Sequence, residues 1–162
     1  MEDIIKLLLH DYEKVEELSD KELRKLISEI LDIEEVPSAL HELHRRDTEQ
    51  AMILGKNILE SNKGDVYLQA AVIDFIFEYD KKYIFDFTME NIITMHWYVY
   101  GCLLDCFSVE SKQTFGKQLS YFFIGTVLNR YKCYGEKERS KIKDNYMWFL
   151  NSYSEMINDE NL

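Results

Sequence analysis

The feature that most constrains this sequence is a helical spacing of apolar residues that recurs along almost its whole length. In the first segment, the residues Ile5, Leu8, Tyr12 and Val15 follow one another at steps of three and four, which places them on one helix face. One proline and six glycines in 162 residues are too few turn residues for a sandwich or barrel of many short strands. The sequence therefore predicts an all-α fold.

Local signals divide the periodic regions into about eight helices. Ser19 and Glu22 have the S-x-x-E spacing of a capping box, in which each side chain bonds a main-chain amide at a helix start. Asp47 and Asp65 are expected to cap the two helices that follow them, the first over residues 48–61. Because the connections are short, neighbouring helices are expected to form antiparallel hairpins in a bundle or short solenoid.

The second half of the chain is expected to contain three long helices. Thr88 marks the start of the first, and its inward face is predicted to carry Ile92, His96, Val99, Leu103 and Phe107. The second helix is expected over 112–133, with Phe115, Leu119, Phe122 and Thr126 on one face, and the third over 137–157. Between Tyr79 and Phe87, aromatic residues alternate with other residues at a period of two. This pattern is compatible with an extended connector or with a brief helical turn, and both alternatives stay open.

Domain organisation and compartment follow from what separates the helices. No linker rich in proline, glycine or serine divides the chain, so a single domain over 1–162 is predicted. Acidic Glu2 and Asp3 do not suit a signal peptide, and no stretch approaches the roughly 18 apolar residues of a membrane span. The three cysteines have no disulfide-framework spacing. We therefore expect a cytoplasmic protein with reduced thiols and no membrane partner.

The charge of the chain is strongly acidic and unevenly distributed. Thirty acids and nineteen bases give a net charge of −11. Residues 1–35 contain twelve acids and five bases, whereas residues 91–162 contain eight of each. Binding of a phosphate backbone requires a basic surface, so no direct nucleic-acid binding is expected. An acidic field would instead speed encounter with a basic protein.

Three sets of residues have the types found in metal or catalytic sites, and each has a structural alternative. His41 and His44 are three apart, but no clear third metal ligand accompanies them. Cys102 and Cys106 lack a Cys-x-x-Cys spacing and are typical of small buried helix residues. His96 is expected to be a hydrogen-bonded core or rim residue rather than a catalytic base. We therefore predict a protein that is not an enzyme, with no catalytic residue, cofactor or metal.

Two segments are candidates for contact with a partner protein. The first is an acidic group at the ends of the first two helices, with Glu13, Glu16, Glu17, Asp20, Glu34 and Glu35 as predicted contacts. The second alternates aromatic and acidic residues, and Tyr79, Asp80 and Tyr83 are its predicted contacts because tyrosines often anchor interfaces. A solvated acidic face and local core packing are the respective alternatives.

The stretch from Ser38 to Phe77 resembles the paired helices of HEAT-like repeats. The residues that carry the resemblance are Leu40, Leu43, Asp47, Ala51, Gly55, Leu59, Asp65, Ala70, Ala71 and Ile76. In a small, acidic, all-helical chain, this pattern also resembles immunity proteins of bacterial polymorphic-toxin and contact-dependent growth-inhibition systems. That resemblance implies a non-enzymatic inhibitor that binds one toxin domain, a basic nuclease by expectation, and blocks its active site or substrate groove. A helical adaptor or regulatory protein-binding module is the alternative.

Overall fold

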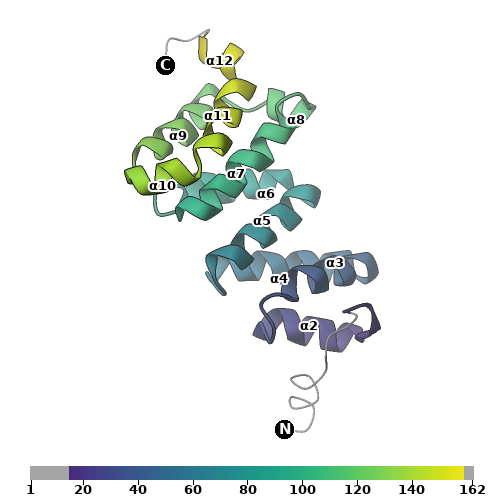
Figure 1. Ribbon diagram of the computed structural model, residues 1–162. Helices are drawn as coiled ribbons and strands as arrows, with labels where there is room; N and C mark the ends of the chain where they lie inside the picture. Colours follow the sequence, from purple (N-terminus) through teal and green to yellow (C-terminus); the bar gives the residue numbers. More distant parts are fainter. Residues whose placement is uncertain (1–14, 159–162) are drawn as a thin grey trace. The chain divides into compact units, whose positions relative to one another are not determined.

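A computed structural model describes residues 15–158, which form helices in two compact units (Figure 1). No strand occurs in this range, and the predicted all-α class is confirmed. The first unit extends to Phe75 and the second begins at Ile76, so the division falls inside helix α5 (Val66–Tyr79). The single domain expected from the sequence stays a prediction.

The first unit is built on an antiparallel helical hairpin. Its complete elements in the described range are η1 (Val15–Glu17), α2 (Asp20–Glu29), α3 (Val36–Arg46) and α4 (Thr48–Glu60). Arg46, at the end of α3, contacts Asp20 at the start of α2, which fixes the opposite directions of these two helices. The side chains that α2 contributes to the core are Leu23, Leu26 and Ile27, all with 0 % exposure.

The capping signals that were read from the sequence begin these helices as predicted. The Ser19 hydroxyl accepts a hydrogen bond from the Glu22 amide at 3.4 Å, and the Glu22 carboxylate accepts from the Ser19 amide at 2.8 Å. Asp47 and Asp65 each accept from the amide three residues further on, at 3.1 Å and 2.8 Å. Each cap satisfies an amide that has no partner within its helix.

The second unit surrounds the long, largely buried helix α7. After the C-terminal part of α5, its helices are α6 (Lys81–Asn91), α7 (Trp97–Glu110), α8 (Thr114–Lys117), α9 (Tyr121–Lys132), α10 (Glu136–Lys141), α11 (Lys143–Ser152) and α12 (Ser154–Asn158). Helix α7 packs directly against α11 and α8. A methyl group at Gly101 in α7 would lie 3.0 Å from Ile142 Cγ2, so the chain approaches α7 closely at the α10–α11 junction.

Three buried tyrosines connect the elements around α7 through main-chain oxygens. The Tyr100 hydroxyl donates to a carbonyl oxygen of α9 at 2.8 Å. The Tyr153 hydroxyl donates to a carbonyl oxygen of α7 at 2.6 Å, and the Tyr134 hydroxyl donates to the Met95 carbonyl at 2.8 Å. Burial is the largest cause that raises the pKa of each phenol, so all three donors stay neutral under ordinary conditions.

The segment from Tyr79 to Phe87 is mostly helical, which settles the choice between connector and helical turn. Tyr79 ends α5, Asp80 caps α6, and the remaining residues form the first turns of α6. Thr88 was wrongly predicted to start a helix. It is buried inside α6, where its hydroxyl donates to the Ile84 carbonyl at 2.7 Å. A threonine hydroxyl bonds the preceding turn as readily as it caps a helix, so its presence alone did not mark a boundary.

The long helix expected through Ile92 and His96 is interrupted. Helix α6 ends at Asn91, and α7 begins only at Trp97. His96 was wrongly placed on an apolar stripe: it is exposed, and its Nδ1 accepts from the Tyr98 amide at 3.2 Å as the cap of α7. Ile92 stays buried in the connection, so the apolar spacing continued in the sequence where the helix did not.

The helices predicted over 112–133 and 137–157 are also broken. Ser120 caps α9 by accepting from the Phe123 amide at 3.1 Å, after α8 has ended at Lys117. Phe122 was wrongly expected to face the core: it is 74 % exposed, whereas its neighbour Phe123 is fully buried. In the last region, Ile142 and Tyr153 interrupt the helix but remain buried. These buried side chains preserved the apolar pattern across the breaks.

Two further properties bear on the predictions about compartment. Within residues 15–158, no helix has both the length and the apolar character needed to cross a bilayer. None of the three cysteines forms a disulfide: Cys106 is buried, Cys102 is half-buried and Cys133 is exposed.

Candidate protein-binding surfaces

The predicted acidic residues at the start of α2 lie around a single arginine. Arg46 Nη1 donates to the Leu18 carbonyl at 2.6 Å and to Asp20 Oδ1 at 3.1 Å. Its Nη2 donates to the Glu16 carbonyl at 2.7 Å, and its Nε donates to Glu42 Oε1 at 2.6 Å. Arg46 therefore holds η1 and the start of α2 against the end of α3.

Glu42 is the buried carboxylate of this network, with 8 % of its surface exposed. Arg45 Nε donates to Glu42 Oε2 at 3.0 Å, and Arg45 Nη2 donates to Glu42 Oε1 at 2.7 Å. These bonds from Arg45, with the bond from Arg46, outweigh burial and lower the pKa of Glu42 to about 2. We name Asp20, Glu42, Arg45 and Arg46 the arginine cluster.

The arginine cluster occupies part of the acidic group that was predicted to face a partner. Asp20 is paired with Arg46, and the pKa of the Arg45 guanidinium is raised mainly by its bonds to Glu42, with a smaller contribution from the nearby Glu16 carboxylate. Glu17 is exposed, and Glu13 lies outside the described residues. The start of α2 is therefore less negative than its number of acids indicates.

The opposite end of the α2–α3 hairpin carries four acidic side chains. Glu29, Asp32, Glu34 and Glu35 lie there, and we name these four residues the acidic turn. None of them forms an ion pair with a basic side chain of residues 15–158. The ten residues of α2 span about 15 Å at 1.5 Å per residue, so the acidic turn and the arginine cluster are separate surfaces.

The acidic turn has a defined backbone and an apolar side chain among its carboxylates. Ile30 ends α2 in the left-handed region with φ at 50°, and Asp32 Oδ1 accepts from the Glu34 amide at 3.1 Å. Ile33 is 36 % exposed in the same turn. An apolar contact surrounded by charge is the usual anatomy of a protein interface, and the charge here favours a basic partner.

The predicted contacts Tyr79, Asp80 and Tyr83 have local structural partners. Asp80 Oδ1 accepts from the Tyr83 amide at 3.0 Å and caps α6. The Tyr83 ring stacks on Phe87 with ring centroids 6.4 Å apart. Tyr79 is 43 % exposed. The pKa of its phenol is raised, first by the partial burial of the ring and second by the nearby Glu78 carboxylate. Local packing therefore explains much of this segment, and its contact with a partner stays a prediction.

The two candidate metal-binding histidines have an aromatic neighbour within the first unit. His41 and His44 meet the Phe75 ring edge-on, with ring centroids 5.0 Å and 5.7 Å away. In the described part of the chain, no three histidine, cysteine or acidic side chains are grouped as metal ligands would be.

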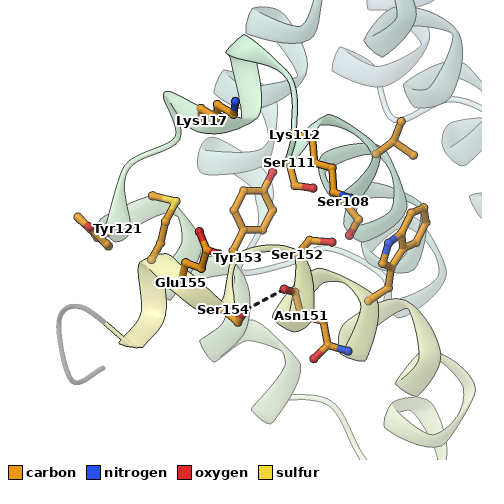
Figure 2. A pocket seen from close by; sticks show the side chains of 13 residues that line it. Ser108, Ser111, Lys112, Lys117, Tyr121, Asn151, Ser152, Tyr153, Ser154 and Glu155 are labelled. Atoms are coloured by element: carbon orange, nitrogen blue, oxygen red, sulfur yellow. Dashed lines mark hydrogen bonds between the residues drawn. The ribbon is translucent and has the colours of Figure 1, made fainter.

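The second unit contains an open groove that the sequence reasoning did not identify (Figure 2). Its volume is about 1130 Å³, and it is lined by the end of α7, by α8, by the first residue of α9, and by α11 and α12. The groove follows the breaks between helices, which sequence periodicity concealed. The sequence did contain one signal for the groove, a group of serines near those breaks. Four of the residues that line the groove are serines: Ser108, Ser111, Ser152 and Ser154.

No protein-family model matches this chain, and a search of curated proteins finds no significant match. Function is therefore inferred from the surfaces of the chain itself.

Proposed function

We propose that this chain is an immunity protein, a non-enzymatic cytoplasmic inhibitor that binds a basic toxin domain and blocks its active site or substrate groove. The observation that carries the proposal is the acidic turn, whose four carboxylates have no basic partner in residues 15–158. Negative potential of this kind steers a positively charged partner and disfavours wrong ones. A nuclease supplies the complementary charge, because its substrate groove must attract phosphates.

The distribution of charge along the chain supports the same assignment. Residues 1–75 contain 18 acids and nine bases, for a net charge of −9, whereas residues 76–162 contain 12 acids and ten bases, for −2. The resemblance of residues 38–77 to HEAT-like hairpins and immunity proteins points in the same direction. Because exposed charges are screened within about 8 Å at physiological salt, association with the toxin should depend on salt.

A helical adaptor or regulatory module is the second candidate. It is favoured by the groove of the second unit, where Val109 and Trp148 are 60 % and 45 % exposed. An adaptor would bind several proteins weakly and exchangeably, whereas an immunity protein would bind one partner tightly.

Capture from the source cells separates the two candidates. The baits are the tagged full-length chain, an acidic-turn variant (E29Q/D32N/E34Q/E35Q) and a control variant that removes four exposed acids elsewhere (E49Q/E90Q/E136Q/D144N). We expect one basic protein that the unaltered chain and the control retain at moderate salt and that the acidic-turn variant loses.

The captured protein should arrest growth when it is expressed alone, and co-expression of the unaltered chain should restore growth. Several weakly held partners would instead favour the adaptor. Retention by the acidic-turn variant at the control level would contradict the role of the turn.

A further inference from the structure

The groove of the second unit has the size and the apolar wall of a peptide site. Its volume of about 1130 Å³ is slightly above the roughly 300–1,000 Å³ of most small-molecule pockets. Val109 from α7 and Trp148 from α11 lie on its wall and are both exposed. Helices α7 and α11 pack directly against each other, so this wall is part of the packed unit. Tryptophan is among the residues that most often anchor protein contacts.

Two lysines give the groove a charge opposite to that of the chain. Lys112 and Lys117 are exposed, and neither pairs with an acid in the described part of the chain. Figure 2 shows them along the α7–α8 edge, with Asn151 and Ser154 on the α11–α12 edge. Glu155 is the one acid among the lining residues, so the lining is net positive in a chain of net charge −11. This charge complements a carboxylate-rich ligand.

The hydrogen-bonding groups of the groove favour a ligand rich in acceptors. The hydroxyls of Ser111, Tyr121 and Ser152 have no hydrogen-bond partner within residues 15–158 and are available as donors. The Ser108 and Tyr153 hydroxyls already donate to main-chain carbonyls, each at 2.6 Å. A peptide presents such acceptors as main-chain carbonyls and as acidic side chains.

We propose that this groove binds an acidic segment of a partner protein. An apolar side chain of the segment packs against Val109 and Trp148, and its carboxylates bind Lys112 and Lys117. This second site does not rest on the proposed toxin inhibition, because the acidic turn lies in the other unit and suits a partner of opposite charge.

Selection from a random dodecapeptide library on the full-length chain tests this site. We expect enriched peptides with several aspartates or glutamates around an aromatic or aliphatic residue. The sequence contains two tryptophans, Trp97 and Trp148. In W97F, the emission of the remaining Trp148 should therefore shift when the most enriched peptide is added.

Matched variants locate the binding. K112E/K117E and W148A should each weaken binding of the most enriched peptide at least tenfold. The control variant K137E/K143E changes two exposed lysines outside the groove and should bind this peptide as the unaltered chain does. The acidic-turn variant should also bind normally, so the two sites are tested independently. Circular dichroism melting establishes that each variant is folded. Enrichment of basic or uncharged peptides, no enrichment, or undiminished binding to folded K112E/K117E would overturn the proposal.

Discussion

The two units of this chain are stabilised by different chemistry. In the first, Arg46 donates to the carboxylates of Glu42 and Asp20, and it also donates to main-chain carbonyls of η1 and of Leu18. In the second, the hydroxyls of Tyr100, Tyr134 and Tyr153 bind main-chain carbonyls at 2.6–2.8 Å. Bonds to a carboxylate are lost in acid, whereas bonds from a neutral phenol persist over a wide pH range. We therefore expect the first unit to lose stability in acid before the second does.

The position of the tryptophans lets the two units be followed separately. Trp97 and Trp148 both lie in the second unit. Tryptophan emission therefore reports on the second unit, whereas far-ultraviolet circular dichroism reports on the helices of both.

The largest expected effect comes from the aromatic core of the second unit. Phe123 stacks on Phe85 with ring centroids 4.6 Å apart and meets Phe107 at 4.9 Å. F123A should lower the free energy of unfolding by about 3–5 kcal/mol, because it leaves a cavity. F122A is the matched control and should change it by less than about 0.5 kcal/mol, because Phe122 is exposed. Denaturant unfolding followed by tryptophan emission measures both, and equal losses would place Phe122 in the core.

Acid should act on the first unit before the second. The lowered pKa of Glu42 means that its contribution to stability is complete above about pH 4.5 and is lost as the pH falls toward 2. We expect circular dichroism to lose helix in this window while tryptophan emission is retained. E42Q should destabilise the first unit at pH 7 and should have a shallower acid dependence, since its side chain does not titrate. Coincident loss of both signals would break the contrast between the units.

Removal of one phenol hydroxyl should have a smaller effect without acid dependence. Y153F deletes the donor to the Phe107 carbonyl but keeps the ring. It should lower the free energy of unfolding by about 0.5–1.5 kcal/mol, the usual contribution of one hydrogen bond. The loss should be the same at pH 5 and at pH 8. A loss that changes with pH would show that this bond involves a titrating group.

A change in stability of similar size is expected at the start of α2. S19A removes the capping hydroxyl that accepts from the Glu22 amide. Its cost should be about 1 kcal/mol, detected by circular dichroism but not by tryptophan emission. S19D restores an acceptor at the helix start and should recover most of the loss. A shift in tryptophan emission with S19A would mean that the two units unfold as one.

Much of the fold was predictable because it depends on local rules. The caps at Ser19, Asp47 and Asp65 act on amides three residues away, so their residue types and spacing were sufficient. The predictions failed where buried side chains continued the helical spacing through a break, as Ile142 and Tyr153 do. The spacing of apolar residues indicates which side chains are buried, but it does not indicate whether the backbone between them is helical.

The candidate surfaces were less predictable than the helices. Glu42 and Arg46 are four residues apart, which indicates an ion pair on one helix, but the reach of Arg46 to Leu18 and Asp20 depends on how α2 and α3 pack. That packing separates Glu34 and Glu35 from Asp20. The groove was invisible for a similar reason, since it is lined by residues from 108 to 156 that only the fold of the second unit brings together.

The central claim is that the acidic turn guides a basic toxin domain onto this chain. The most direct test is the association rate with the captured partner, measured by stopped flow at low and moderate salt. At low salt, the acidic-turn variant should associate about tenfold more slowly than the unaltered chain, and its rate should vary less with salt. The control variant, with the same loss of charge at other exposed positions, should be much less affected. Equal rates and equal salt dependence for the two variants would contradict the claim.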